Sequence, residues 1–159
     1  MFDVKAYSGD RKKDYELLYK QLEALSEDET EAVTILSNAS ALLNQFLDDI
    51  NWVGFYLWKN DELKLGPFQG LPACTRIAYG KGVCGTAVER EESILVADVN
   101  TFPGHIACDA ASQSEVVVPI FKDEKIYGVL DVDSPTLKRF DEEDQRYLEQ
   151  FVKILETYI

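Results

Sequence analysis

The stretch "SEVVVPIFKDEKIYGVLDVDS", residues 114–134, contains two strand-like runs separated by three polar residues, 122–124. Both runs are rich in β-branched and aromatic side chains, a composition that favours strands. We predict that they form an antiparallel hairpin in which Phe121 pairs with Lys125. Because side chains alternate between the two faces of a strand, one face of this hairpin is expected to be core. The predicted core face carries Val116, Val118, Ile120, Ile126, Gly128 and Leu130.

The opposite face of the hairpin carries acids at one end. In the predicted register Glu115 lies across from Asp131, and Asp133 follows on the same side. The preceding loop, "FPGHIACDAASQ", brings the only histidine of the chain, His105, and the thiol of Cys108 to the same end. Solvated acids at a strand end are the plain alternative. The thiol and the imidazole beside them favour a reactive site.

Helices are expected before and after the strands. Apolar residues recur at helical spacing from Tyr15 to Leu25, and Ser26 can cap a second helix with Glu29 as its capping-box partner. Asp141 is the expected cap of a last helix, "EEDQRYLEQFVKILETY". The inner face of the second helix is expected to carry Val33, Leu36, Leu43 and Leu47.

Further strands are expected between the second helix and the hairpin. "NWVGFYLW", 51–58, and "LKL", 63–65, flank the turn residues Asn60 and Asp61, which suggests another hairpin. One face of its first strand carries Trp52, Gly54 and Tyr56. "GKGVCGTAVERE" is a glycine-rich turn that runs into a short helix, and "SILVAD" is a strand. The chain therefore reads as helix, then sheet, then helix.

Composition bounds the class of protein. The chain has 159 residues, of which 46% are hydrophobic, and this suits one compact domain over residues 1–159. Its 16 basic and 29 acidic residues give a net charge of −13, which repels nucleic-acid backbones and anionic membrane surfaces. We therefore expect neither nucleic acid nor a membrane as a partner.

The sequence also indicates a compartment. No apolar stretch approaches the roughly 20 residues that span a bilayer, and "MFDVKAYSGDRKKD" lacks the apolar core of a signal peptide. We expect a cytoplasmic protein. In that reducing compartment the odd set Cys74, Cys84 and Cys108 does not form a disulfide scaffold. Any disulfide is expected to be transient and catalytic.

Three motifs carry a resemblance: "LGPFQGLPACTRIAYGKGVCG", "FPGHIACDAASQSEVVVPI" and "GVLDVDSP". Together they resemble the motif set of the free methionine-(R)-sulfoxide reductases, a family of GAF-domain proteins, over roughly residues 51–135. The resemblance implies an α+β, GAF-like fold with a central antiparallel sheet of about six strands flanked by helices. It also implies a ligand pocket between one sheet face and the overlying loops.

The resemblance further implies an enzyme of oxidative-stress defence. This oxidoreductase reduces free L-methionine-(R)-sulfoxide to methionine through a cysteine sulfenic acid and an intramolecular disulfide, which thioredoxin recycles. The family's nucleophile falls on Cys108, and its resolving and recycling thiols fall on Cys74 and Cys84. Either Cys74 or Cys84 is expected to form the disulfide with Cys108. Its catalytic acids fall on Glu115 and Asp133. The implied substrate-binding residues are Trp52, Tyr56, Glu115, Asp131 and Asp133, although on spacing alone the two aromatics would be core.

The chemistry of sulfoxide reduction explains why a thiol and several acids gather. A sulfoxide sulfur is electrophilic, but its oxygen leaves only after protonation, so the site needs a thiolate and a proton donor. Acids in a small desolvated space cannot all ionise, so at least one stays neutral near pH 7. The same acids attract the ammonium of a free amino acid. Their charge opposes thiolate formation at Cys108, and a cationic substrate or backbone N–H groups could offset this.

Other interpretations compete with this one. The cysteines and His105 could bind zinc, but they contain no C-x-x-C pair, so no metal is predicted. A lone histidine more often bonds a loop carbonyl, so His105 stays outside the catalytic set. "GKGVCG" lacks the phosphate-loop pattern. A GAF sensor that binds a small ligand without catalysis is the alternative function, and the thiol trio argues against it.

The expected partners follow from the same interpretation. They are free methionine sulfoxide and an external thioredoxin-like reductant, with no bound cofactor. A homodimer is one option for the oligomeric state.

Overall fold

The computed structural model describes residues 2–4, 6–106 and 108–159. Within these residues six strands form one sheet in the order β3-β2-β1-β6-β5-β4, and all neighbours are antiparallel. The central antiparallel sheet of the predicted α+β fold is thereby confirmed. The strands are β1 (Trp52–Lys59), β2 (Glu62–Gly70), β3 (Arg76–Ala78), β4 (Ile94–Val96), β5 (Ser114–Lys122) and β6 (Lys125–Ser134).

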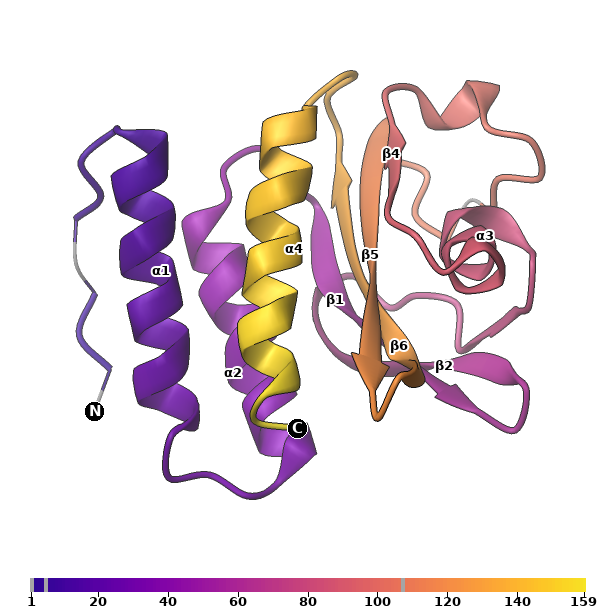
Figure 1. Cartoon of the computed structure of the whole chain (residues 1–159). Helices are drawn as coiled ribbons and strands as arrows, with labels where there is room; N and C mark the ends of the chain where they lie inside the picture. The colour runs from indigo at the N-terminus through magenta and orange to yellow at the C-terminus, as the bar shows by residue number, and fades with distance from the viewer. Residues whose placement is uncertain (1, 5, 107) are drawn as a thin grey trace.

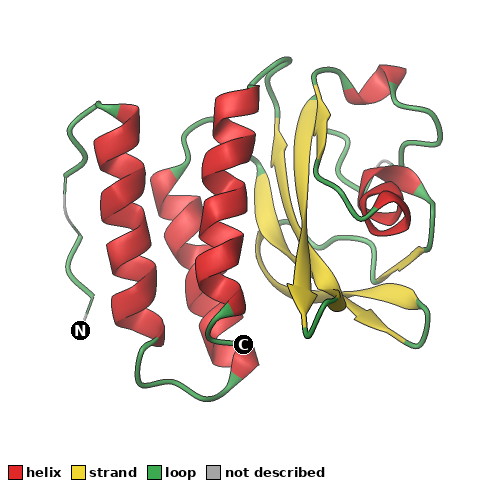
Figure 2. Cartoon of the chain, viewed as in Figure 1, coloured by secondary structure: helices red, strands yellow, loops and turns green. Residues whose placement is uncertain are grey.

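The helices cover the two faces of the sheet unequally (Figures 1 and 2). They are α1 (Arg11–Ser26), α2 (Ala32–Phe46), α3 (Gly82–Arg90) and α4 (Glu142–Glu156), with a short 3₁₀ turn η1 (Val99–Thr101). Helices α2 and α4 pack on one face, and α1 packs on both of them from outside. Helix α3 and the loops around it cover the other face. No helix of the described residues is long and apolar enough to cross a bilayer.

Strand β1 divides its side chains between two apolar cores. Val53 and Phe55 point into the core beneath α1, α2 and α4, whereas Trp52 and Tyr56 point into the core beneath α3. This division follows from the two-residue period of a strand. The shared face predicted for Trp52 and Tyr56 is confirmed, and it is the face that α3 covers.

The register of the β5–β6 hairpin differs from the predicted one by two residues. The turn contains only Asp123 and Glu124, both with positive φ (53° and 65°), so Lys122 pairs with Lys125. Two consecutive residues of positive φ are typical of a type I′ turn, which matches the twist of a hairpin. The pairing shifts by one further residue between Ile120 and Phe121, because Ile120 pairs with Gly128 and Phe121 with Ile126, which leaves Tyr127 of β6 as a bulge.

The offset changes the partners of the predicted residues. Val118 faces Leu130 instead of Gly128, and Glu115 faces Asp133 instead of Asp131. Because a two-residue shift keeps each side chain on its face, Val118 and Leu130 remain in the predicted core. Ile126 precedes the bulge, pairs with Phe121 and packs in the opposite core, so its predicted face was wrong.

The start of the second helix was also predicted wrongly. Ser26 ends α1, and α2 begins only at Ala32 without a side-chain cap. The Glu29 carboxylate instead accepts hydrogen bonds from the N–H groups of residues 30 and 31, at 2.8 and 2.9 Å, inside the connecting turn. Leu36, Leu43 and Leu47 are buried as predicted, but Val33 is 61% exposed, because the buried stripe of α2 begins at Ile35.

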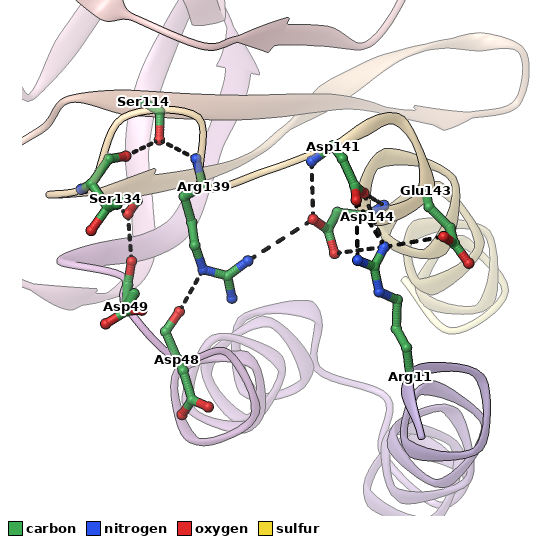
Figure 3. Close-up of polar contacts among 10 residues, drawn as sticks. Arg11, Asp48, Asp49, Ser114, Ser134, Arg139, Asp141, Glu143 and Asp144 are labelled. Atoms are coloured by element: carbon green, nitrogen blue, oxygen red, sulfur yellow. Dashed lines mark hydrogen bonds and ion pairs between the residues drawn. The ribbon is translucent and has the colours of Figure 1, made fainter. Parts of the chain in front are cut away.

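The predicted cap of the last helix is confirmed. The Asp141 carboxylate accepts from the N–H of Asp144 at 2.8 Å, and Asp144 accepts from the N–H of Asp141 at 3.0 Å (Figure 3). Arg11 of α1 donates three hydrogen bonds to Asp141, two at 3.0 Å and one at 3.2 Å. These bonds hold the pKa of Asp141 well below its usual range. One carboxylate therefore caps α4 and links it to α1.

Asp141→Ala is expected to lower the free energy of unfolding by about 1–2 kcal/mol, because it removes a helix cap and a partly exposed bidentate ion pair. Urea unfolding followed by circular dichroism measures the change. The matched control is Glu142→Ala in the same helical turn, which should change stability by less than about 0.5 kcal/mol. Equal effects of the two substitutions would contradict the capping role.

Serine hydroxyls hold the end of the hairpin that carries the acids (Figure 3). Ser134 Oγ donates to the carbonyl of Asp49 at 2.5 Å, and Ser114 Oγ donates to a carbonyl of the β6–α4 connection at 2.6 Å. These serines directly adjoin Asp133 and Glu115 in the chain. The bonds therefore position the backbone from which both carboxylates extend.

Candidate active site

A pocket opens on the face of the sheet that α3 covers. It encloses about 500 Å³ of space between atoms, its open mouth included. Its walls come from β1, β5, β6, the start of α3 and the loop between η1 and β5. The predicted site residues that line it are Trp52, Tyr56, Cys84, Cys108, Glu115, Asp131 and Asp133.

Three carboxyl groups lie at the floor of this pocket. Glu115 and Asp131 are only 6% and 5% exposed. Burial and the charges of Asp131 and Asp133 raise the pKa of Glu115 well above its usual range. Burial and the charge of Asp131 likewise raise the pKa of Asp133 well above its usual range. The cluster therefore holds protons at a higher pH than isolated acids do, which is the property that a proton donor in this pocket needs.

Asp131 differs from the other two carboxyl groups in the contacts that oppose its burial. Burial raises its pKa, but hydrogen bonds with Glu115 and Cys84 oppose the rise. Its Oδ1 atom is buried and has no hydrogen-bond partner among the described residues. A buried carboxylate oxygen without a partner is costly, so this atom is suited to a cationic or proton-donating ligand.

The cysteines are not equivalent. Cys74 and Cys108 form a disulfide with their Cα atoms 5.5 Å apart, within the usual range for such a bond. From the sequence, either Cys74 or Cys84 could be the disulfide partner of Cys108. The structure shows that the partner is Cys74. Cys84 is a free thiol at the start of α3 and is 3% exposed. Burial and the charge of Asp131 raise the pKa of the Cys84 thiol well above its usual range.

This difference predicts the pattern of thiol modification. In the oxidised chain, iodoacetamide at pH 7.5 is expected to label no thiol while the fold is intact, because Cys84 is buried and protonated. After unfolding in denaturant, one thiol per chain should be labelled, and peptide mapping should locate it at Cys84. As the control, the reduced native chain should gain label at Cys74 and Cys108. Rapid labelling of Cys84 in the folded oxidised chain would contradict the assignment.

Aromatic rings lie beside the acids on the same face of the sheet, because Trp52 of β1 pairs with Asp133 of β6. Trp52 stacks on Phe68 and Tyr56, with ring centroids 5.2 and 5.8 Å apart. Gly54 lies between Trp52 and Tyr56 on β1, and a Cβ atom there would collide with Phe68. The indole N–H donates to the Leu71 carbonyl at 3.1 Å, which orients the ring. Because Gly54 has no side chain, Phe68 can lie close to β1 and stack on Trp52.

Sequence reasoning missed the group that holds the cysteine loop. Asn51 Nδ2 donates to Asp109 at 2.9 Å and to the Ser112 hydroxyl at 3.1 Å. Asp109 and Ser112 also line the pocket. No local spacing connects Asn51 with residues about 60 positions away; the only signal was a polar residue directly before an aromatic strand.

His105 lies in the pocket as well. Its Nε2 atom is 3.9 Å from Glu115 Oε1, which is longer than a direct hydrogen bond. Burial lowers the pKa of the imidazole, and the charge of Asp131 opposes this effect. The expectation that His105 stays outside the catalytic set remains a prediction.

The comparisons with known proteins agree with this geometry. The family model described as GAF domain matches residues 26–159. Protein YtsP of Bacillus subtilis is 60% identical over 158 residues, which are 98% of this chain and 97% of that protein. The free methionine-R-sulfoxide reductase of Escherichia coli is 52% identical over 145 residues, which are 91% of this chain and 88% of that protein.

A solved structure extends the likeness to the whole fold. The X-ray structure of free methionine-R-sulfoxide reductase from Neisseria meningitidis, in complex with its substrate, is 44% identical and has a TM-score of 0.95. The match covers 99% of this chain and 95% of that one. Sheet, helices and pocket thus define a GAF-domain protein. Within that class, the chain belongs to the free methionine-R-sulfoxide reductases, a family of oxidoreductases.

Proposed function

We propose that this chain reduces free L-methionine-(R)-sulfoxide to methionine and uses its own thiols as the reductant. The observation that carries the proposal is the Cys74–Cys108 disulfide, formed beside a pocket whose floor is a buried carboxyl cluster. The names of the relatives in Escherichia coli and Neisseria meningitidis support the same substrate. The R preference rests on these names alone.

In the first step, the Cys108 thiolate attacks the sulfoxide sulfur. A protonated acid of the cluster, Glu115 or Asp133, gives its proton to the sulfoxide oxygen, whose bond to sulfur breaks. The oxygen then bonds to the Cys108 sulfur while the bond between that sulfur and the substrate sulfur breaks, so Cys108 becomes a sulfenic acid and methionine leaves. Sulfur of the substrate is reduced by two electrons, and Cys108 is oxidised by two. The raised pKa values of Glu115 and Asp133 support this role, since they keep a proton available near pH 7.

In the second step, the Cys74 thiol attacks the sulfenic sulfur of Cys108. A disulfide forms, and the sulfenic hydroxyl takes up the proton of the Cys74 thiol and leaves as water. An external dithiol of the thioredoxin type then reduces the disulfide by exchange. Because this cycle needs reduced thiols between turnovers, we place the enzyme in the cytoplasm.

The pocket divides its contacts between the two ends of the substrate. The ammonium pairs with Asp131, whose partnerless oxygen is suited to a cation, and with the charge that Glu115 and Asp133 share. Trp52 and Tyr56 contact the S-methyl end. A bound cation also favours the Cys108 thiolate, because it offsets the negative charge of the acids.

The direct experiment measures methionine formation from the separated R and S sulfoxides of free methionine, with a thioredoxin system as reductant. We expect turnover of the R form only. Turnover of the S form at a similar rate would contradict the proposed substrate, and no turnover of either form would contradict the enzyme.

Trp52→Ala is expected to raise KM for methionine sulfoxide at least about tenfold, which is about 1.4 kcal/mol, with a smaller change in kcat. The loss of the stacked ring removes binding area but leaves the reacting thiol and acids in place. Because Ala leaves a large cavity, Trp52→Phe is a milder second variant. The matched control is Trp58→Phe, whose ring packs on Tyr79 outside the pocket lining and should leave KM unchanged.

A further inference from the structure

Cys84 has no role in the cycle proposed above, yet it lies against the acids. Its Sγ atom and carboxylate oxygens of Glu115 and Asp131 all lie within 4.8 Å of one another. The three residues come from α3, β5 and β6, and all are more than nine-tenths buried. Their donor atoms therefore converge at one point on the floor of the pocket.

The geometry points to a binding site for Zn²⁺ formed by Cys84, Glu115 and Asp131. A thiolate with two carboxylates is a donor set that Zn²⁺ accepts, whereas Mg²⁺ and Ca²⁺ disfavour sulfur. Bond lengths of about 2.3 Å to sulfur and about 2.0–2.2 Å to oxygen place tetrahedral ligand atoms roughly 3.5 Å apart. Small side-chain rotations close the remaining gap.

A second observation favours a cation at this point. Asp131 is 5% exposed, lines the pocket and has a buried Oδ1 atom without a hydrogen-bond partner among the described residues. Within the described residues, the ion-pair contact of this cluster joins Glu115 Oε1 and His105 Nε2, which lie 3.9 Å apart. A divalent ion would give the orphaned oxygen a ligand bond and compensate the crowded negative charge.

The site does not need the reactive cysteines. Cys108 and Cys74 are bonded to each other, while Cys84 keeps its thiol in the oxidised chain. The open pocket leaves room for a further ligand on the metal, such as water. The metal site is therefore available in both redox states of the disulfide.

Occupation has a functional consequence that rests on the function proposed above. Glu115 and Asp131 are also the proposed partners of the substrate ammonium, so Zn²⁺ and substrate exclude each other. Zn²⁺ acts as an inhibitor that is competitive with methionine sulfoxide and is removed by a chelator.

Metal binding is tested without any activity assay. Zn²⁺ is titrated into the oxidised full-length chain against a chromophoric chelator, and we expect one ion per chain. Cys84→Ser should weaken binding at least about tenfold, since losing only an outer partner of a ligand already costs about 10–100-fold. Asp131→Asn should weaken it similarly. Glu142→Gln, which removes an exposed carboxylate away from the pocket, is the control and should bind as the unaltered chain does.

A cobalt titration identifies the ligand directly. In the Cys74→Ser/Cys108→Ser double variant, Cys84 is the remaining thiol, and bound Co²⁺ should show the near-ultraviolet absorption of a cobalt–thiolate bond. This variant keeps the test valid if Cys84→Ser fails to fold. Binding without that absorption, equal binding by Cys84→Ser, or no binding by the oxidised chain would each overturn the site. If Zn²⁺ binds as expected but no sulfoxide is reduced, the proposed function fails and the metal site stands.

Discussion

Cys108→Ser is expected to abolish methionine release in a single turnover, with a loss of at least about a thousandfold, because a serine hydroxyl cannot replace the thiolate nucleophile. The experiment mixes prereduced enzyme with excess free methionine-(R)-sulfoxide, without external reductant, and measures methionine by chromatography. The unaltered chain should release one methionine per chain and end with the Cys74–Cys108 disulfide.

The other two cysteines provide the controls. Cys74→Ser should still release one methionine, because the sulfenic acid forms before the resolving step, but it should fail in repeated turnover with thioredoxin. Cys84→Ser should also release one methionine, since Cys84 lies outside the disulfide. Substantial release by Cys108→Ser, or a burst lost equally in all three variants, would falsify the assignment of the nucleophile.

Blocking the amino group of the substrate is expected to lower kcat/KM at least about a hundredfold, because an unpaired buried charge costs several kcal/mol. Asp131 and its neighbours carry more negative charge than one proton transfer needs, and their burial makes a carboxylate costly when the ammonium is missing. N-acetyl methionine-(R)-sulfoxide amide keeps the sulfoxide and the S-methyl group but lacks the cation. The two substrates are compared under the same reductant.

Asp131→Asn separates charge recognition from steric exclusion. The variant should have a lower kcat/KM for the free amino acid. The ratio of kcat/KM between the free and the blocked substrate should also fall, because a neutral amide does not require a cationic partner. If the unaltered enzyme reduces both substrates equally well, the enzyme does not recognise the ammonium group of the substrate. If the preference is unchanged in Asp131→Asn, the blocked substrate is excluded by size, and the role given to Asp131 is wrong.

The β5–β6 hairpin shows how far sequence reasoning reached. The alternation of apolar residues located both strands and assigned Val118 and Leu130 to the core, because that period depends only on strand geometry. The pairing was wrong by two residues, because it depends on the turn and on a bulge after Ile120. Neither has a marker in the sequence, since Asp123 and Glu124 are not a glycine-containing turn pair.

Other errors have the same origin. Ser26 and Glu29 match a capping box, but the first helix extends to Ser26, whose side chain is buried in the last turn. Asn51 holds the cysteine loop through Asp109, a contact between residues 58 positions apart. Local patterns cannot predict such contacts, because they form only when distant strands and loops meet.

By itself, the sequence determined the fold class, the strands of the central sheet other than β3, the cap at Asp141 and the residue types of the site. These follow from periodicity, turn chemistry and motifs, which act over a few residues. Only the tertiary structure decided that Cys108 pairs with Cys74, that Cys84 faces Asp131, and that the acids are buried together, which raises their pKa values. Disulfide pairing depends on the separation of Cα atoms, and the pKa of an acid depends on desolvation and neighbouring charge. Both quantities exist only once the sheet, α3 and the cysteine loop enclose one pocket.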